Sequence, residues 1–169
     1  SYTEGHIPNS IFVDVDTDLA SEKMPGTGRH PLPDPNTFSE KLSHWGMSNN
    51  KQVVVYDDAG GAFAGRLWWM LKWLGHEAVA VLDGGLNSWV KGGNKLVTTP
   101  TVFEKAHFEP CVQENMIATV DDVEEAQFKM NTILLDARSK ERYQGINDPV
   151  DPIACLLYTS DAADDLTRV

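Results

Sequence analysis

The sequence has few cysteines, few cationic residues and no long hydrophobic run. Its 169 residues include only two cysteines, Cys111 and Cys155, too few for a disulfide framework or a cysteine metal cluster. Lys and Arg number 14 against 25 Asp and Glu, which gives a net charge of −11. Such a charge repels nucleic acids and anionic membranes, so we expect neither as a partner. No apolar run approaches the ~18 residues of a membrane span, and the composition is typical of a soluble globular protein.

A further absence concerns the loop that follows the strand predicted at residues 52–56. Residues 52–56 predict a strand and residues 62–74 predict a helix that ends at Gly75. In α/β proteins, backbone N–H groups converge on such a strand-to-helix turn, and ligands bind there. This turn offers the carboxylates of Asp57 and Asp58 but no Cys, Ser or Lys. The usual active-site position therefore holds no nucleophile.

The first hundred residues predict strands that alternate with helices. We expect strands at residues 11–16, 52–56 and 78–82, and helices at 38–45, 62–74 and 86–90. Asn36 or Thr37 is the predicted cap of the first helix, and Asp83 that of the third. Residues 17–35 contain several Pro and Gly residues and predict a long loop. Short alternating units of this kind imply a parallel sheet with right-handed crossovers.

The pattern changes after Pro100. Residues 101–111 predict an extended connector. Thr119 and Asp122 form a capping signal for a helix over 119–125. Residues 133–138 predict a further strand, so a second βα domain begins here.

Short motifs occur in a fixed order along the chain. They are Gly5-His6-Ile7-Pro8, His30-Pro31-Leu32-Pro33, Val53-Val54-Val55-Tyr56-Asp57, Arg66-Leu67-Trp68-Trp69-Met70, Leu82-Asp83-Gly84-Gly85-Leu86, Leu135-Asp136-Ala137-Arg138 and Arg142-Tyr143-Gln144-Gly145. Each is weak alone, but their order and spacing are specific. From Gly5 to Ala154 the chain resembles the tandem rhodanese-type sulfurtransferases, the family of thiosulfate and 3-mercaptopyruvate sulfurtransferases.

The resemblance implies an α/β fold with a rhodanese-like parallel sheet flanked by helices, followed by the start of a second such domain. Residues 1–100 would form a first, non-catalytic domain that lacks its first strand, and residues 101–118 a linker. Residues 119–154 would begin the second, catalytic domain. Asp57 stands where the first domain of this family has lost its cysteine. The nucleophilic cysteine of the second domain would lie beyond this chain.

Residues 155–169 depart from the family pattern. They resemble the translation of a sequencing-library adapter, and we expect them to be a non-native tail. Cys155 belongs to this tail and has no glycine-rich loop or cation beside it, so it is not expected to be the nucleophile. Cys111, in the predicted connector, is expected to be structural.

The resemblance also suggests site residues, each with a simpler alternative. Asp16 and His30 match an acid and a histidine that are proposed to relay a proton during thiolate attack; the alternatives are a strand-end cap and a loop histidine bonded to the backbone. Arg142 matches an arginine that holds the anionic end of the substrate, the alternative being a solvated residue at a helix edge. Arg66 is expected to be a charge partner of Asp57 or Asp58. No metal or organic cofactor is implied.

The family's activity proceeds by a ping-pong mechanism. A cysteine thiolate takes sulfane sulfur from thiosulfate or 3-mercaptopyruvate as a persulfide and passes it to cyanide or a thiol. The expected partners are thus a small anionic sulfur donor and a thiol or cyanide acceptor. The full-length protein is expected to be a cytoplasmic monomer, and this fragment to be inactive.

Two other functions remain open. One is a non-catalytic rhodanese-like module for binding or regulation. The other is a phosphatase of the related dual-specificity type, which needs a Cys-x5-Arg loop. The turn at Asp57 lacks that cysteine.

Overall fold

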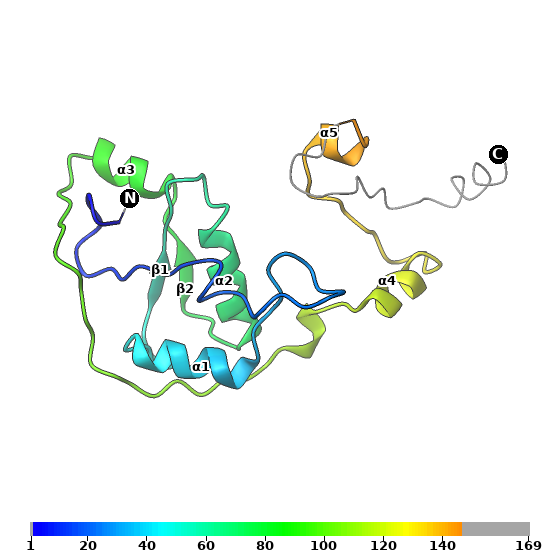
Figure 1. Cartoon of the computed structure of the whole chain (residues 1–169), viewed down its shortest axis with the longest axis horizontal. Helices are drawn as coiled ribbons and strands as arrows, with labels where there is room; N and C mark the ends of the chain where they lie inside the picture. The colour runs from blue at the N-terminus through cyan, green and yellow to red at the C-terminus, as the bar shows by residue number, and fades with distance from the viewer. Residues whose placement is uncertain (1, 147–169) are drawn as a thin grey trace. The chain divides into compact units, whose positions relative to one another are not determined.

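The computed structural model describes residues 2–146 and shows two compact units, Ser1–Ile117 and Ala118–Val169. The tail predicted at residues 155–169, with Cys155, lies outside the described residues, as does the end of the segment predicted at 119–154. Figure 1 shows the strands of the first unit with the helices around them.

A parallel β-α-β crossover forms the centre of the first unit. In chain order its elements are α1 (Pro35–His44), β1 (Val53–Val55), α2 (Ala64–Trp73), β2 (Val79–Val81), α3 (Gly85–Lys91) and the 3-10 helix η1 (Glu114–Met116). Val53 lies opposite Val79 and Val55 opposite Val81 in the parallel ladder. Helix α2 packs against both strands. The predicted parallel α/β architecture is therefore confirmed in this unit.

The hydrophobic core of the unit draws on helices α1 and α2, on both strands and on loop segments. Its buried side chains are Leu19, Phe38, Leu42, Met47, Val55, Ala64, Met70, Leu71, Trp73, Leu74, Val79 and Phe108. Phe108 belongs to the stretch predicted as a connector; this stretch has no helix or strand and is part of the first unit. Cys111 N–H donates to Leu74 O at 2.9 Å, and Ala106 N–H donates to Ser43 O at 2.9 Å.

Two helix N-termini differ from the prediction. Helix α1 is capped by Asp34, whose Oδ1 accepts from the N–H groups of Asn36 and Thr37 at 3.0 and 2.9 Å. The predicted caps Asn36 and Thr37 are thus already inside the helix. Helix α3 has Gly84 as its N-cap, with φ of +70° and no side-chain capping bond, so the cap predicted at Asp83 is wrong. A glycine adopts this left-handed conformation without the steric cost of a Cβ atom.

Two predicted strands do not form. Residues 11–16 run without regular structure and end in a turn, and residues 133–138 likewise have no strand. Within the described part of the chain, the only sheet is the two-stranded β1–β2 pair. A hydrophobic run becomes a strand only where a neighbouring strand supplies hydrogen-bond partners. Phe12 and Leu135 accordingly remain 59% and 86% exposed.

The second unit contains α4 (Val120–Ala126) and α5 (Lys140–Tyr143). Thr119 and Asp122 form the predicted capping box: Asp122 N–H donates to Thr119 Oγ1 at 3.2 Å, and Thr119 N–H donates to the Asp122 carboxylate at 2.8 Å. No helix within residues 2–146 has the length and apolar character that a membrane crossing requires.

Candidate functional site

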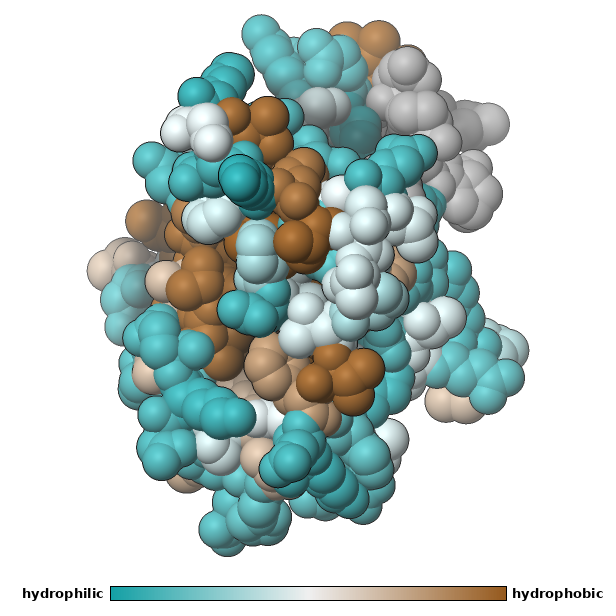
Figure 2. Space-filling view, turned by 90° about the vertical axis from the view of Figure 1, so that its left-hand side faces the viewer, coloured by the Kyte–Doolittle hydropathy of each residue, from teal (hydrophilic) through white to brown (hydrophobic). Residues whose placement is uncertain are grey.

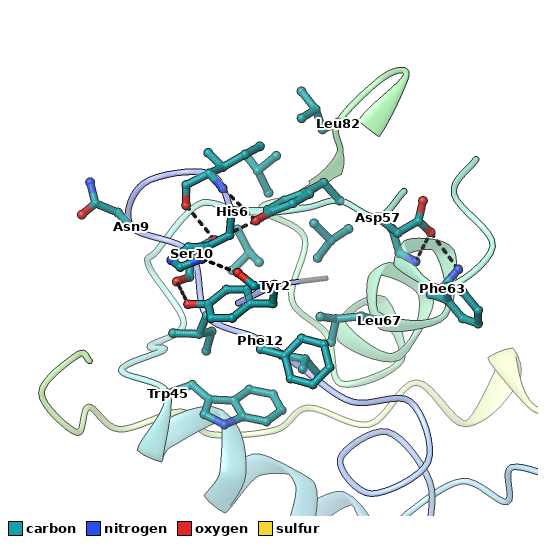
Figure 3. A pocket seen from close by; sticks show the side chains of 18 of the residues that line it. Tyr2, His6, Asn9, Ser10, Phe12, Trp45, Asp57, Phe63, Leu67 and Leu82 are labelled. Atoms are coloured by element: carbon teal, nitrogen blue, oxygen red, sulfur yellow. Dashed lines mark hydrogen bonds between the residues drawn. The ribbon is translucent and has the colours of Figure 1, made fainter. Parts of the chain in front are cut away.

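The turn between β1 and α2 is organised around the carboxylate of Asp57. Its Oδ1 accepts from Ala59 N–H at 3.0 Å and from Gly61 N–H at 2.8 Å. Its Oδ2 accepts from the N–H groups of Phe63 and Ala64, both at 2.9 Å (Figure 3). Four amides that could surround a bound anion are therefore occupied by a side chain of the same turn.

The electrostatics of Asp57 follow from these contacts. Partial burial raises the pKa of the carboxyl, and the four backbone hydrogen bonds, led by that from Ala64, outweigh this effect, so the pKa is lowered overall. An ionised carboxylate thus already fills the N–H cluster. The prediction that this turn lacks a nucleophile is consistent with the geometry, but the sequence did not reveal that Asp57 also occupies the amides.

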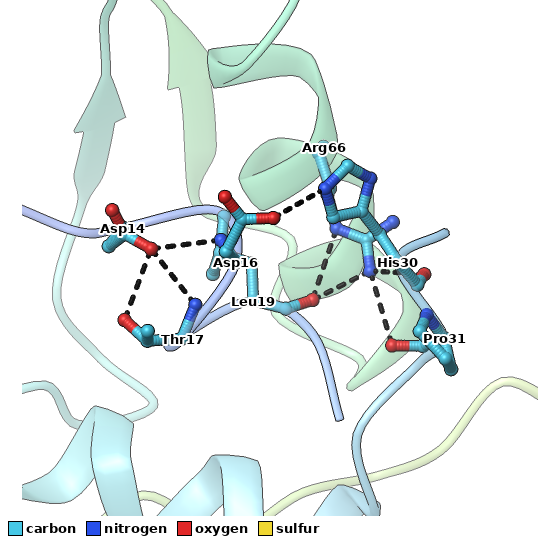
Figure 4. Close-up of polar contacts among 7 residues, drawn as sticks. All are labelled: Asp14, Asp16, Thr17, Leu19, His30, Pro31 and Arg66. Carbon is cyan, nitrogen blue, oxygen red and sulfur yellow. Dashed lines mark hydrogen bonds and ion pairs between the residues drawn. The ribbon is translucent and has the colours of Figure 1, made fainter. Parts of the chain in front are cut away.

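Asp16 and His30 lie together. His30 Nε2 is 2.9 Å from Asp16 Oδ1 (Figure 4). Because an ionised carboxylate can only accept, Nε2 carries a proton and donates it. The Asp16 side chain is 72% exposed and that of His30 31% exposed. The pair is therefore open to solvent, with the other ring nitrogen, Nδ1, turned away from the carboxylate.

Asp14 shapes the turn that presents Asp16, a role that the sequence analysis missed. Its Oδ1 accepts from Asp16 N–H and Thr17 N–H, both at 2.9 Å, and from the Thr17 hydroxyl at 3.1 Å. These hydrogen bonds, above all the one from Thr17 N–H, lower the pKa of the Asp14 carboxyl. The spacing Asp-x-Asp-Thr is the signal of this Asx turn.

Arg66 does not pair with Asp57 or Asp58, so that prediction is wrong. Its Nε and Nη2 atoms both donate to Leu19 O, at 3.1 and 2.6 Å, and Nη2 also donates to His30 O at 3.0 Å. The carboxylate of Asp57 instead accepts from backbone N–H groups of residues 59–64, which lie nearer to it in sequence than Arg66 does.

Arg142 lies in α5 of the second unit and is partly exposed. Its N–H donates to the capping hydroxyl of Ser139 at 3.4 Å. The nearby Asp136 carboxyl accepts from Arg138 Nε at 2.9 and 3.0 Å. The Arg138 hydrogen bonds, with a smaller contribution from the charge of Arg142, lower the pKa of Asp136 to about 2. The charge of Arg142 thus helps to lower the pKa of Asp136. Its role in binding an anionic substrate remains a prediction.

The Gly5-His6-Ile7-Pro8 segment is fixed to the end of β1 by a hydroxyl network. The Tyr56 hydroxyl accepts from Ile7 N–H at 3.2 Å and lies 2.7 Å from Ser10 Oγ (Figure 3). Tyr2 OH donates to Ser10 O at 2.9 Å. The network places this segment along a cavity of about 920 Å³.

That cavity is lined mainly by apolar side chains. Phe12 and Val54 both line it and are 59% and 55% exposed. Figure 2 shows hydrophobic side chains gathered on one face of the molecule. Within residues 2–146, no group of three or more His, Cys, Asp or Glu side chains is placed to hold a metal ion.

Comparison with known proteins finds sulfurtransferases among the relatives of this chain. The chain is 37% identical to the probable 3-mercaptopyruvate sulfurtransferase of Pseudomonas aeruginosa, over 97% of this chain and 61% of that protein. It is 33% identical to the thiosulfate sulfurtransferase of Rattus norvegicus, over 90% of this chain and 51% of that one. The chain therefore spans between half and two thirds of the length of these relatives.

The fold agrees with these relatives. A crystal structure of SseA from Escherichia coli, described as a 3-mercaptopyruvate sulfotransferase with the "Rhodanese" fold, superposes with a TM-score of 0.78 at 30% identity. The match covers 89% of this chain and 56% of SseA. Residues 1–92 match the model of the rhodanese-like domain. The chain belongs to the rhodanese-like domain family.

Proposed function

We propose that this chain is the amino-terminal part of a sulfurtransferase that uses thiosulfate or 3-mercaptopyruvate as the sulfur donor. Relatives carrying those two names support the proposal. The structural observation that carries it is the hydrogen bond of 2.9 Å between His30 and Asp16, an exposed pair suited to moving a proton. In this proposal residues 1–100 are the non-catalytic domain and residues 119–154 the beginning of the catalytic one, with residues 101–118 between them.

The proposed chemistry needs a nucleophile that this turn does not supply. A cysteine thiolate attacks the outer sulfur of thiosulfate, forms a persulfide and releases sulfite. With 3-mercaptopyruvate the same attack breaks the carbon–sulfur bond, and the thiol proton of the donor passes to the enolate of pyruvate. The persulfide then gives its sulfur to cyanide or to a thiol. No metal or organic cofactor takes part.

His30 and Asp16 have a defined task in the second of these reactions. Asp16 holds the Nε2 proton, so Nδ1 is the atom that can take the thiol proton and return it to carbon. Transfer from thiosulfate involves no such proton. Arg142 would bind the carboxylate or sulfonate end of the donor.

A chimaera tests the proposal. Residues 1–154 replace the corresponding part of the Pseudomonas aeruginosa relative, and sulfur transfer to cyanide is measured with both donors. We expect activity, with His30→Gln lowering turnover of 3-mercaptopyruvate by about 10²-fold while thiosulfate turnover changes little. A chimaera that folds and transfers no sulfur from either donor contradicts the proposal. The 1–169 chain alone should form no persulfide.

One observation is also compatible with a second candidate, a non-catalytic module. The Asp57 carboxylate fills the four amides of the β1–α2 turn, which leaves that turn closed to an anionic ligand. A folded but inactive chimaera, together with capture of a specific protein partner by residues 1–117, would favour the module.

A further inference from the structure

Arg66 joins the two ends of the loop that carries His30. Its guanidinium donates twice to Leu19 O and once to His30 O, at distances of 2.6 to 3.1 Å (Figure 4). Nη2 also approaches Pro31 O at 3.5 Å. Leu19 and His30 are eleven positions apart, so one side chain of α2 closes a segment that contains no helix or strand.

Charge pairing does not explain where Arg66 lies. Within the described residues it has no salt bridge, and burial lowers the pKa of its guanidinium. Removing a cation from water costs free energy unless hydrogen bonds replace the lost hydration. Here carbonyl oxygens replace it, and the planar fork of donors is what allows one group to reach two separate carbonyls.

The consequence is that His30 is held at two points. Arg66 fixes its backbone carbonyl, and Asp16 accepts from its ring at 2.9 Å. The same loop is also closed by Ser21 N–H, which donates to Pro31 O at 3.0 Å. With both points fixed, the imidazole keeps one orientation and Nδ1 keeps one direction.

We propose that Arg66 is the positioning residue of the Asp16–His30 pair. It acts through the backbone of His30 and sets the ring orientation in which Nε2 donates to Asp16. The inference rests on the proposed function only in taking this pair as the proton-transfer group; the positioning itself is a property of the chain and is measured without any activity.

The test is an NMR measurement on the 1–169 chain. The readout is the solvent exchange rate of the His30 Nε2 proton, which the hydrogen bond to Asp16 slows. Arg66→Met keeps most of the side-chain volume but removes the donors, and we expect the exchange rate to rise about tenfold. Arg66→Lys keeps the charge without the fork and should give an intermediate rate.

Lys72→Met is the matched control. It removes a cation from the same helix, where Lys72 pairs with Glu77 rather than with the loop. We expect it to leave the His30 exchange rate within about twofold of the unmodified chain. Backbone amide exchange in α1 reports separately on the stability of the whole unit.

The outcomes separate positioning from general stability. The proposal is overturned if the exchange rate of the His30 Nε2 proton in Arg66→Met stays within twofold of that in the unmodified chain. It is also overturned if that rate rises only in step with the exchange rates of the α1 backbone amides. If Arg66→Met does not fold, the proposal is tested by comparing the His30 Nε2 proton exchange rate of Arg66→Lys with that of the unmodified chain. Resolved, slowly rotating Nη signals of Arg66 support the proposal, and fully averaged signals overturn it. An inactive chimaera would contradict the proposed function and leave these measurements unaffected.

Discussion

At the scale of single residues, Asp57 is the side chain whose loss should destabilise the β1–α2 turn most. Asp57→Asn keeps the shape but leaves one acceptor oxygen and places an N–H2 group against amide donors. We expect it to destabilise the first unit by about 1–3 kcal/mol, since hydrogen bonds to a charged acceptor are the stronger ones. Urea unfolding at neutral pH measures the change. Asp58→Asn is the control, because it removes the same charge from the neighbouring position; an equal effect of both variants would contradict this role.

The same carboxylate predicts a dependence of stability on pH. The folded-state pKa of Asp57 lies below its ordinary value of 3.8. Its contribution is therefore complete above about pH 4 and is lost as the pH falls through the folded-state pKa. Unfolding curves at a series of pH values should show the difference between the unmodified chain and Asp57→Asn shrinking below about pH 4. A difference that stays constant down to about pH 2 would exclude this ionisation as its source.

His6 is a second residue for which the structure predicts a large effect. It is 1% exposed, its ring stacks on Tyr2, and its Nδ1 and Nε2 atoms lie 2.8 and 3.1 Å from the carbonyl oxygens of Tyr2 and Thr99. His6→Ala leaves a cavity and two carbonyls without this partner, so we expect a loss of about 2–4 kcal/mol. Thermal unfolding measures it, with the exposed His44→Ala as control, expected within about 0.5 kcal/mol.

At the scale of elements, the start of α3 depends on a close approach to the β1 turn. Gly85 has φ of +56°, and a Cβ atom there would lie 2.3 Å from the backbone oxygen of Asp57. Leu86 N–H donates to that same oxygen at 2.9 Å. Gly85→Ala must therefore displace backbone as well as adopt a strained conformation, and we expect it to cost about 2–4 kcal/mol.

Gly93→Ala separates the two causes of that loss. Gly93 also has a positive φ, +76°, but open space surrounds its Cβ position. Only the conformational cost of about 1 kcal/mol applies there. Chemical denaturation of both variants gives the comparison, and equal losses would show that contact with the Asp57 oxygen is unimportant.

Elements with local signals were predictable from the sequence, and elements that depend on distant partners were not. The helices α2 and α4 follow from apolar spacing and from the Thr119–Asp122 capping pair, and β1 and β2 follow from short β-branched runs. Residues 11–16 are also rich in β-branched side chains, but within residues 2–146 no strand pairs with them. The proximity of Asp16 and His30 followed only from the family resemblance, and the contacts of Arg66 with two carbonyls had no signal, because backbone acceptors leave no trace in residue type.

At the scale of the whole molecule, the first unit should fold without the second. Its core is complete within residues 1–117, and the extended residues 106–113 contribute to it through Phe108, which is 2% exposed, and through hydrogen bonds to α1 and α2. A chain that ends at Ile117 should therefore give amide NMR signals for residues 2–110 that overlay those of the longer chain, with an unchanged unfolding midpoint.

A chain that ends at Gly93 is the matched test of the connector. It loses Phe108 together with the bond from Cys111 N–H to Leu74 O, and removing one large buried aromatic side chain alone costs about 3–5 kcal/mol. That is a large part of the stability of a domain of this size, so the shorter chain should unfold at a much lower urea concentration. Equal stability of the two shortened chains would contradict a structural role for residues 94–117, and failure of the Ile117 chain to fold would show that the first unit needs the second.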